Sequence, residues 1–297
     1  MGLFYCQLHP KWYNNNMKTY ILLFRCRDQK GIVAKISQFV LSKNGNMISA
    51  DQYSTDPENG QLFLRIEFFV PNGLIDLADL EKGFRKIAVS FKAGYKFFNK
   101  DNILRMGIFV SKPGHCLFDL LYLWRSGELD VEIPFVASNH EEHRRLVEQF
   151  GVPFYYIQSC RNKRCEKELL YLSKEADFLV LARYMLVLSP KFLKSYKGDI
   201  INIHHGFLPS FKGPDPYRQA LARGVKIIGA TAHFVSEELD AGPIISQAVE
   251  RVTHKDNLEA LKRKGKNLEK RALSDAVLHY VEHRIIRHNN KTIVFEK

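Results

Sequence analysis

The sequence predicts an α/β protein with two domains, a small βαββαβ sandwich followed by a larger domain on a mainly parallel sheet. Three observations lead to this fold class. The chain has 297 residues, more than one domain usually holds. Up to residue 99, short apolar segments surround two amphipathic stretches, and after Asp101 strands alternate regularly with helix-length segments. We expect domains at 18–99 and 102–297, after a disordered leader at 1–17.

Apolar periodicity and turn residues place the elements of the first domain. β-Branched and aromatic side chains begin at Thr19, and the turn Asp28–Gly31 opens a helix. The expected order is a strand at 19–26, a helix that runs to Leu41, strands at 48–54 and 61–70, a helix at 77–91 and a strand at 95–98. This order over about 80 residues is typical of a ferredoxin-like sandwich.

The second domain shows the alternation of strands and helices that is typical of a parallel sheet. The expected strands are 103–110, 131–137, 154–157, 178–182, 199–204 and 226–235. In such sheets, ligands bind beyond the carboxyl ends of the strands. The first turn of this domain, Ser111–His115, lacks both the glycine fingerprint of dinucleotide binding and a Walker loop. This argues against dinucleotide binding and phosphoryl transfer.

The strand at 199–204 ends in candidate catalytic residues. Because side chains alternate between the faces of a strand, Asn202 and His204 point to the same side and His205 points away. Asp240 lies on a turn between two expected strands, from which its carboxylate can reach His204. We predict that Asn202, His204 and Asp240 are catalytic, as amide donor, titrating imidazole and orienting carboxylate. His205 and His233 are expected to lie outside the site.

Three motifs occur in the order found in a known enzyme family. They are Asn202–His204, the loop Leu208–Gly213 and the turn Asp240–Ile245. Residues 102–297 therefore resemble the catalytic domain, Rossmann-like in fold, that folate-dependent formyltransferases share with formyltetrahydrofolate deformylases. The first domain resembles the ACT module, a regulatory domain, on the Asp28–Val33 turn and Gly45–Met47. The pair of domains is similar to the deformylase branch, since the transferases generally lack the ACT module.

The resemblance implies a reaction and further site residues. The reaction is hydrolysis of 10-formyltetrahydrofolate to formate and tetrahydrofolate, without a cofactor, which supplies formate for purine synthesis and balances the one-carbon pool. The implied folate-binding residues are Arg183, Met185, Leu186, Val235 and Glu238, with Arg183 on the folate glutamates. An amino-acid effector such as glycine or methionine is implied at Asp28, Gly31, Gly45 and Asn46, together with a homo-oligomer formed through the ACT-like domain.

Alternative functions remain open. A transferase that formylates a small amine of the glycinamide ribonucleotide type shares the catalytic triplet, and Arg218–Ala220 matches the transferase pattern. Such transferases hold an anion in a glycine-rich turn where this chain has Ser111–Gly114, which favours water as the acceptor. An initiator-tRNA formyltransferase would need an RNA-binding domain after Lys297, and a non-catalytic amino-acid sensor would not need the triplet. Gly206, Pro214 and Arg218 depart from the deformylase pattern.

Charge and cysteine content restrict the partners. The net charge is +12, and basic residues are dense over 255–271, which we expect to be a helix with a basic outer face interrupted by Glu259 and Glu269. The positive charge of this helix would attract the polyglutamate tail of a folate. The helix lacks the aromatic residues that stack on bases, so no nucleic-acid partner is expected.

The chain also lacks the signals of a metal site, a secretory leader and a membrane segment. Cys160 and Cys165 have no zinc-site spacing, and no metal is predicted. No apolar run reaches the roughly 20 residues that span a membrane. A cytoplasmic protein is expected, with Met17 as an alternative start.

Overall fold

The computed structural model describes residues 17–56, 58–71, 75–158, 165–210 and 215–296. The chain forms two compact units, 1–102 and 103–297, each with its own buried core. In the described ranges no helix is long and apolar enough to cross a membrane. Residues 1–16 of the expected leader lie outside the described ranges. Met17 was expected in the leader but is the first residue of a strand.

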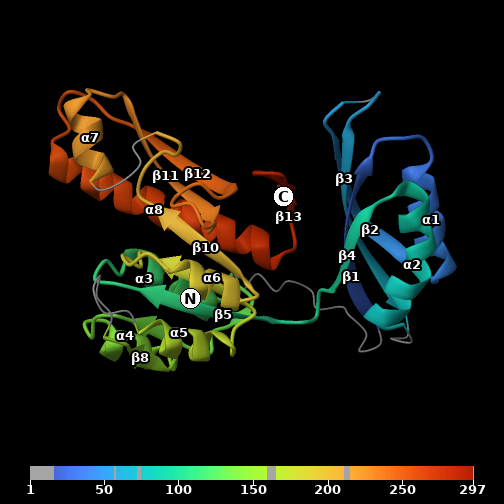
Figure 1. Cartoon of the computed structure of the whole chain (residues 1–297), viewed down its shortest axis with the longest axis horizontal. Coiled ribbons are helices and arrows are strands. Elements are labelled where there is room, and N and C mark those ends of the chain that lie inside the picture. Colours follow the sequence, from blue (N-terminus) through green and yellow to red (C-terminus); the bar gives the residue numbers. More distant parts are fainter. Residues whose placement is uncertain (1–16, 57, 72–74, 159–164, 211–214, 297) are drawn as a thin grey trace, which may run out of the picture. The chain divides into compact units, whose positions relative to one another are not determined.

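The first unit is an antiparallel sheet of four strands covered by two helices (Figure 1). Its elements are β1 (Met17–Arg27), α1 (Ile32–Ser42), β2 (Asn46–Ser54), β3 (Gln61–Pro71), α2 (Leu77–Phe91) and β4 (Gly94–Asn99). The strand order is β2-β3-β1-β4, and β1 is antiparallel to both of its neighbours. The predicted ferredoxin-like βαββαβ topology is confirmed.

Alternating apolar side chains of the strands form the core of this unit. Leu22 and Phe24 of β1 are fully buried, and Phe24 meets Phe84 of α2 edge-on, with 6.0 Å between ring centroids. The predicted bounds of α2 agree with the structure. The helix begins after Asp76, whose side chain accepts a hydrogen bond from the backbone N–H of Asp79 at 2.8 Å. Such a cap stabilises a helix by about 1 kcal/mol.

The second unit contains a sheet of eight strands with helices on both faces. Its elements are β5 (Leu104–Val110), α3 (His115–Ser126), β6 (Val131–Glu132), β7 (Val136–Ser138), α4 (Arg144–Gln149), β8 (Phe154–Tyr156), α5 (Glu166–Ser173), β9 (Phe178–Ala182), α6 (Pro190–Ser195), β10 (Asp199–His204), α7 (Pro216–Ala222), β11 (Ile227–Phe234), β12 (Ile244–Arg251) and α8 (Leu258–Val281), followed by the hairpin β13 (Ile285–His288) and β14 (Lys291–Val294).

The order in the sheet is β12-β11-β10-β9-β5-β7-β8, with β6 beside β5. The strands from β8 to β10 pair in parallel, and β11 and β12 add an antiparallel edge, so the predicted mainly parallel sheet is confirmed. The expected strand 131–137 is divided into β6 and β7 instead. Pro134 lies between them and has no backbone N–H for the ladder.

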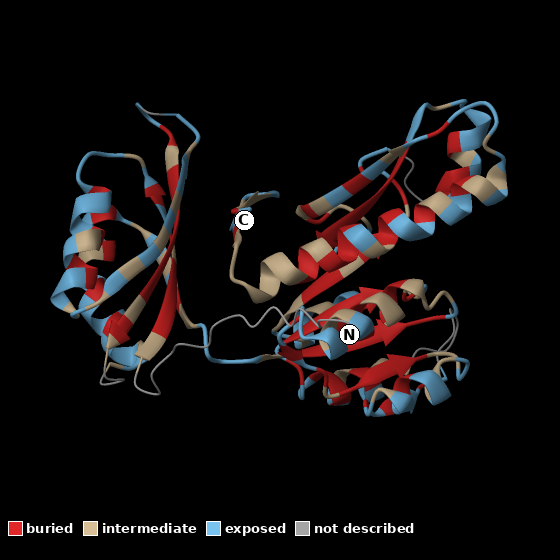
Figure 2. Ribbon diagram, turned by 180° about the vertical axis from the view of Figure 1, so that it is seen from behind, coloured by how far each residue is buried: buried red, intermediate tan, exposed pale blue. Residues whose placement is uncertain are grey.

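Both faces of this sheet are buried, as the buried strands in Figure 2 show. Ile108 and Val180 point to the core shared with α3, α4 and α8. Their neighbours Phe109 and Leu179 point to the opposite core, under α5 and α6. Such burial on two sides explains the continuous apolar runs in the parallel strands.

Helix α8 differs from its prediction in two respects, its length and the position of one charged residue. It spans Leu258–Val281 where a helix over 255–271 was expected. Leu261 and Leu268 are buried on its inner side, as the apolar spacing predicted. Glu269 was expected on the basic outer face, but it is 2% exposed. It is accommodated inside the protein because three polar side chains from other elements contact its carboxylate.

Gly265 of α8 is required by close packing against Tyr217. A Cβ at this position would lie 2.1 Å from Cζ of Tyr217. We expect Gly265→Ala to lower the free energy of unfolding by about 1–2 kcal/mol, because over-packing outweighs the gain of about 1 kcal/mol in helix propensity. Urea unfolding measures this. Gly83→Ala in α2, where no atom would lie closer than 3.2 Å, is the control, and an equal response of the two variants would contradict the argument.

Candidate active site

The three predicted catalytic residues meet at the carboxyl end of β10. Asn202 and His204 lie on this strand, and Asp240 lies in the turn between β11 and β12. β11 pairs antiparallel with β10, with Phe234 opposite Ile201 and Thr231 opposite His204. The turn therefore leaves β11 beside the first half of β10, and Asp240 lies back toward His204. Nδ1 of His204 lies 3.2 Å from Oδ2 of Asp240, and His204 is 4% exposed. The three residues that were predicted as catalytic from the sequence therefore lie close together in the structure.

Close packing holds the turn that carries Asp240. Asp240 has a left-handed backbone with φ of 54°, which Asp adopts more readily than most residues. A Cβ on Gly242 would lie 1.8 Å from the carbonyl oxygen of Phe234, so only glycine fits there. The side-chain amide of Asn290 donates to the carbonyl oxygen of Ala241 at 3.1 Å. These contacts position the carboxylate beside His204.

His233 belongs to the same cluster, contrary to the expectation from sequence. It lies directly opposite Asn202 in the β10–β11 register and is 1% exposed. Its Nδ1 is 2.9 Å from the carbonyl oxygen of Phe234, which can only accept, so Nδ1 carries the proton. Its Nε2 then accepts a hydrogen bond from the amide nitrogen of Asn202 at 3.2 Å. One amide hydrogen of Asn202 is left for another acceptor.

The charges of the cluster suit acid–base chemistry. Burial raises the pKa of the Asp240 carboxyl, but the hydrogen bond from His204 outweighs burial and holds this pKa well below its usual range. Asp240 is therefore ionised at neutral pH. Nε2 of His204 is buried and has no hydrogen-bond partner among the described residues. Because buried polar atoms are normally paired, this nitrogen marks a place for a ligand.

His205 follows the last residue of β10 and was expected to point away from the site, but its ring contacts that of His204. Its ring centroid lies 5.3 Å from that of His204 and 6.0 Å from that of Tyr217. Burial and, after it, the nearby charge of Arg183 together lower the pKa of His205 to about 4. His205 is thus a neutral residue between the catalytic cluster and Tyr217.

The protonation of His205 should make the protein less stable as the pH falls. In the unfolded chain a histidine takes up a proton near pH 6.5, whereas in the folded protein its pKa is about 4. The unfolded state binds more protons in this window, so stability falls from pH 6.5 downward, by about 3 kcal/mol at full effect. Urea unfolding measures the free energy of unfolding at pH 7 and at pH 5. We expect this free energy to change less between the two pH values in His205→Gln than in the wild type. His254→Gln, at an exposed site, is the control; equal pH dependence in all three proteins would contradict this.

The loop after β10 is held by Thr231 and Gln247. The backbone N–H of Leu208 donates to Oγ1 of Thr231 at 3.0 Å, and that hydroxyl donates to the carbonyl oxygen of Gly206 at 2.9 Å. Nε2 of Gln247 donates to the carbonyl oxygen of Leu208 at 2.9 Å. Gly206, which departs from the deformylase pattern, therefore lies in a loop that is held by hydrogen bonds to side chains of β11 and β12.

The other two departures from the family pattern lie elsewhere. Pro214 is in the segment 211–214, outside the described residues. Arg218 pairs with Asp215 at 2.9 Å, and its side chain is 71% exposed. Arg218 therefore reaches its neighbour on the surface of α7 and not the catalytic cluster.

Four of the expected folate-binding residues flank the cluster. Met185 and Leu186 follow β9, and Val235 and Glu238 follow β11. Leu186 and Val235 are half-buried and pack against one core, whereas Met185 is 52% exposed. The exposed, flexible Met185 next to Leu186 in the chain is suited to contact with a flat, largely apolar ring.

Arg183 has a different environment from the one expected. Its side chain is 11% exposed, and its Nε lies 3.1 Å from Oε2 of Glu269, as an ion pair without hydrogen-bond geometry. An arginine that is paired inside the protein does not extend toward a glutamate tail in solvent. The expected contact of Arg183 with the folate glutamates is therefore corrected to a buried contact with α8.

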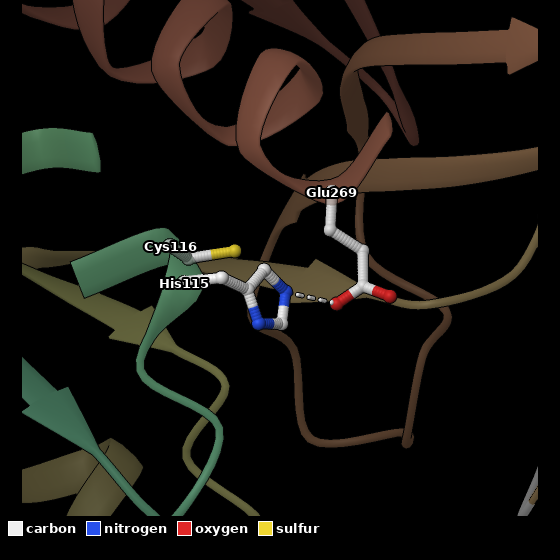
Figure 3. A group of neighbouring side chains, drawn as sticks. All are labelled: His115, Cys116 and Glu269. Carbon is white, nitrogen blue, oxygen red and sulfur yellow. Dashed lines mark hydrogen bonds and ion pairs between the residues drawn. The ribbon is translucent and has the colours of Figure 1, made fainter. Parts of the chain in front are cut away.

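Glu269 is the centre of a buried polar network, of which Figure 3 shows the contact with His115. Nε2 of His115 lies 2.8 Å from Oε2 of Glu269, and the hydroxyl of Tyr217 donates to Oε1 at 2.6 Å. Burial raises the pKa of the Glu269 carboxyl, but the bond from His115, the charge of Arg183 and the bond from Tyr217 outweigh it and lower this pKa below its ordinary value. The network therefore contains a buried carboxylate.

One group in this region has the spacing of a metal site. The ligand atoms of His115, Cys116 and Glu269 lie within 4.8 Å of one another. The Arg183 cation already pairs with Glu269, and burial raises the pKa of the Cys116 thiol well above its usual value, which keeps it protonated. Metal ligands must be deprotonated, so the group is poorly suited to an ion.

The four residues expected to bind an amino acid do not form one site within a chain. Asp28 and Gly31 precede α1, and Gly31 has a φ of 87° at the start of this helix. Gly45 and Asn46 follow the other end, where the N–H of Gly45 donates to the carbonyl oxygen of Val40 at 2.9 Å. Since α1 has 11 residues, the two pairs are about 16 Å apart along its axis. Both glycines also have a role in the backbone of the turns.

Comparison with known proteins identifies the family of the chain. The family model of the formyl transferases matches residues 104–277. A formyltetrahydrofolate deformylase of Bacillus subtilis is 46% identical over 278 residues, which cover 92% of this chain and 93% of that protein. The chain belongs to the formyltetrahydrofolate deformylase family. The crystal structure of a family member from Pseudomonas syringae matches at a TM-score of 0.89 and 41% identity, over 96% of both chains.

The family relationship covers both units, whereas the likeness to transferases does not. The glycinamide ribonucleotide transformylase 1 of Symbiobacterium toebii matches at a TM-score of 0.62 and 28% identity. It covers 67% of this chain but 97% of its own. About a third of this chain therefore lies beyond the part shared with this transferase.

Proposed function

We propose that this protein hydrolyses 10-formyltetrahydrofolate to formate and tetrahydrofolate. The observation that carries the proposal is the cluster of Asn202, His204 and Asp240, in a chain that aligns with named deformylases over 92% of its length. An amide donor and an imidazole held by a carboxylate are the groups that addition of water to a formamide requires.

The proposed reaction uses the free atoms of the cluster. The free amide hydrogen of Asn202 binds the formyl oxygen and stabilises the negative charge that develops on it. Asp240 holds Nδ1–H of His204, so that Nε2 accepts a proton from the attacking water. Oxygen of the water bonds to the formyl carbon, His204 passes the proton to N10, and the C–N10 bond breaks. The products are formate and tetrahydrofolate, and the reaction needs no cofactor.

Transfer to a small amine is the second candidate function, because the transferase of Symbiobacterium toebii shares the fold. The first turn of the second unit favours water instead. Nε2 of His143 lies 3.2 Å from the carbonyl oxygen of Ser111 and 2.9 Å from that of Lys112, and a Cβ on Gly114 would lie 2.7 Å from the His143 ring. A turn covered by a side chain in this way offers no open cradle for an anionic amine substrate.

Incubation with 10-formyltetrahydrofolate tests the two candidates. We expect stoichiometric formate and tetrahydrofolate without an amine, at a rate that does not change when glycinamide ribonucleotide is added. Formation of tetrahydrofolate only when the amine is present, with formylated amine as the product, would contradict the proposal.

The remaining aspects of the function are also proposals. The folate ring binds against Met185, Leu186 and Val235, with Glu238 at its edge, and the released formate serves purine synthesis. The first unit binds an amino acid such as glycine or methionine between two copies of the chain, since the two pairs of expected residues lie apart in one copy. The protein acts in the cytoplasm, a reducing compartment that suits its buried free thiols at Cys26 and Cys116.

Binding of the effector and pairing of chains are measured directly. Calorimetry with glycine and with methionine tests binding, and sedimentation with and without the amino acid tests whether the ligand favours a dimer. If the protein stays monomeric and binds neither glycine nor methionine, the first unit does not have the proposed role of binding an amino acid between two chains.

A further inference from the structure

The sheet of the second unit changes direction between β5 and β9. From β5 the chain passes through α3 to β7 on one side, and later returns through α5 to β9 on the other side of β5. In open α/β sheets such a reversal leaves a crevice beyond the carboxyl ends of the two strands, where a ligand normally binds. β10, with the catalytic residues, is the next strand beyond β9.

In this protein the crevice is filled by its own polar side chains. The segments that follow the two strands are joined, because the N–H of Ser111 donates to the carbonyl oxygen of Arg183 at 3.3 Å. Beyond them lies the Glu269 network, in which His115, Tyr217 and Arg183 contact both oxygens of the carboxylate. A buried, compensated carboxylate with three partners is a costly arrangement, since replacing such groups by apolar ones is often neutral or stabilising.

The network borders the catalytic cluster. The ring of Tyr217 contacts that of His205, and the ring of His205 contacts that of His204, with the centroid distances of 6.0 and 5.3 Å given above. The charges of Arg183 and Glu269 both act on His205. The filled crevice is therefore continuous with the space in which an acceptor would approach the formyl carbon.

We propose that the Arg183–Glu269 pair is a specificity determinant that fills the acceptor side of the site, so that water reaches the formyl carbon and amines do not. This inference rests on the proposed deformylase function and explains why the same catalytic residues yield hydrolysis. Arg183 is suited to this role because its left-handed backbone, with φ of 65°, directs the side chain inward to α8. With the crevice open, an amine nitrogen attacks the formyl carbon, the C–N10 bond breaks, and the proton lost by the amine goes to N10.

Two matched double variants separate the volume of the pair from its charge. Arg183→Ala with Glu269→Ala opens the crevice without leaving a buried charge unpaired. Arg183→Met with Glu269→Gln removes the charges but keeps most of the volume. Each purified variant is checked for folding by circular dichroism and thermal melting, and then incubated with 10-formyltetrahydrofolate and increasing glycinamide. Formate and N-formylglycinamide are measured together, and reactions without enzyme give the background.

We expect the wild type and the filled variant to produce formate alone. The opened variant should produce N-formylglycinamide, with an amide-to-formate ratio at least tenfold above that of the wild type and saturating in glycinamide. An unchanged ratio in the folded opened variant would overturn the proposal, as would equal transfer by the filled variant. If the opened variant fails to fold, Arg183→Ala alone is measured by the same ratio. The proposed function itself is judged separately, by release of formate from the wild type without amine.

Discussion

Asp240→Asn should lower kcat for formate release by about 10²–10⁴-fold, the range that a general acid–base unit contributes. The carboxylate holds Nδ1–H of His204 at 3.2 Å and leaves Nε2 free for the water proton. An asparagine amide in its place can donate to Nδ1, which favours the tautomer with the proton on Nε2, and this nitrogen then no longer accepts. We expect KM to change little, because the carboxylate acts on His204 and the water.

Single-turnover kinetics across pH 5 to 9 would measure this effect apart from product release. Asp177→Asn is the control, because Asp177 is an ion-paired carboxylate immediately before β9, at the amino end of the sheet, with Arg105 2.9 Å away. We expect that control to keep wild-type kcat. A folded Asp240→Asn enzyme with near-normal turnover would remove Asp240 from the mechanism.

Asn202→Ala should lower kcat by about 10²–10³-fold, which is the typical cost of losing one oxyanion donor. The residue has one amide hydrogen on His233 and one that is free for the formyl oxygen. The loss appears in kcat more than in KM, because the charge on that oxygen develops only in the transition state.

Two further variants distinguish donation from packing at this position. Asn202→Asp keeps the shape but cannot donate when ionised, so we expect a loss at least as large as for alanine. His233→Ala leaves the amide without its orienting partner and should give a smaller loss, with the fold retained. Equal activity of the Asp and Asn enzymes would show that hydrogen-bond donation is not the role of Asn202.

Much of the fold could be predicted because it depends on short-range patterns. The bounds of α2, β9 and β10 agree with the predicted ranges, since apolar period and capping residues lie within each segment. The split between β6 and β7 was missed although Pro134 is a local signal, because the apolar run around it dominates the pattern.

The part of the site that depends on the alternation of side chains along a single strand could be predicted. Period two alone places Asn202 and His204 on one side of β10. His233 was missed because its place opposite Asn202 depends on the register between β10 and β11, which the alternation in one strand does not define.

By itself, the sequence determined the two α/β units, the ordered motifs and the grouping of Asn202, His204 and Asp240, because each follows from local periodicity or from resemblance. Only the tertiary structure decided that Arg183 and Glu269 face each other. These residues are 86 positions apart, and each looks like an ordinary charged surface residue in its own segment. Their burial depends on how α8 packs against β11, β10 and α3, and contacts between distant segments leave no periodic signal in the sequence.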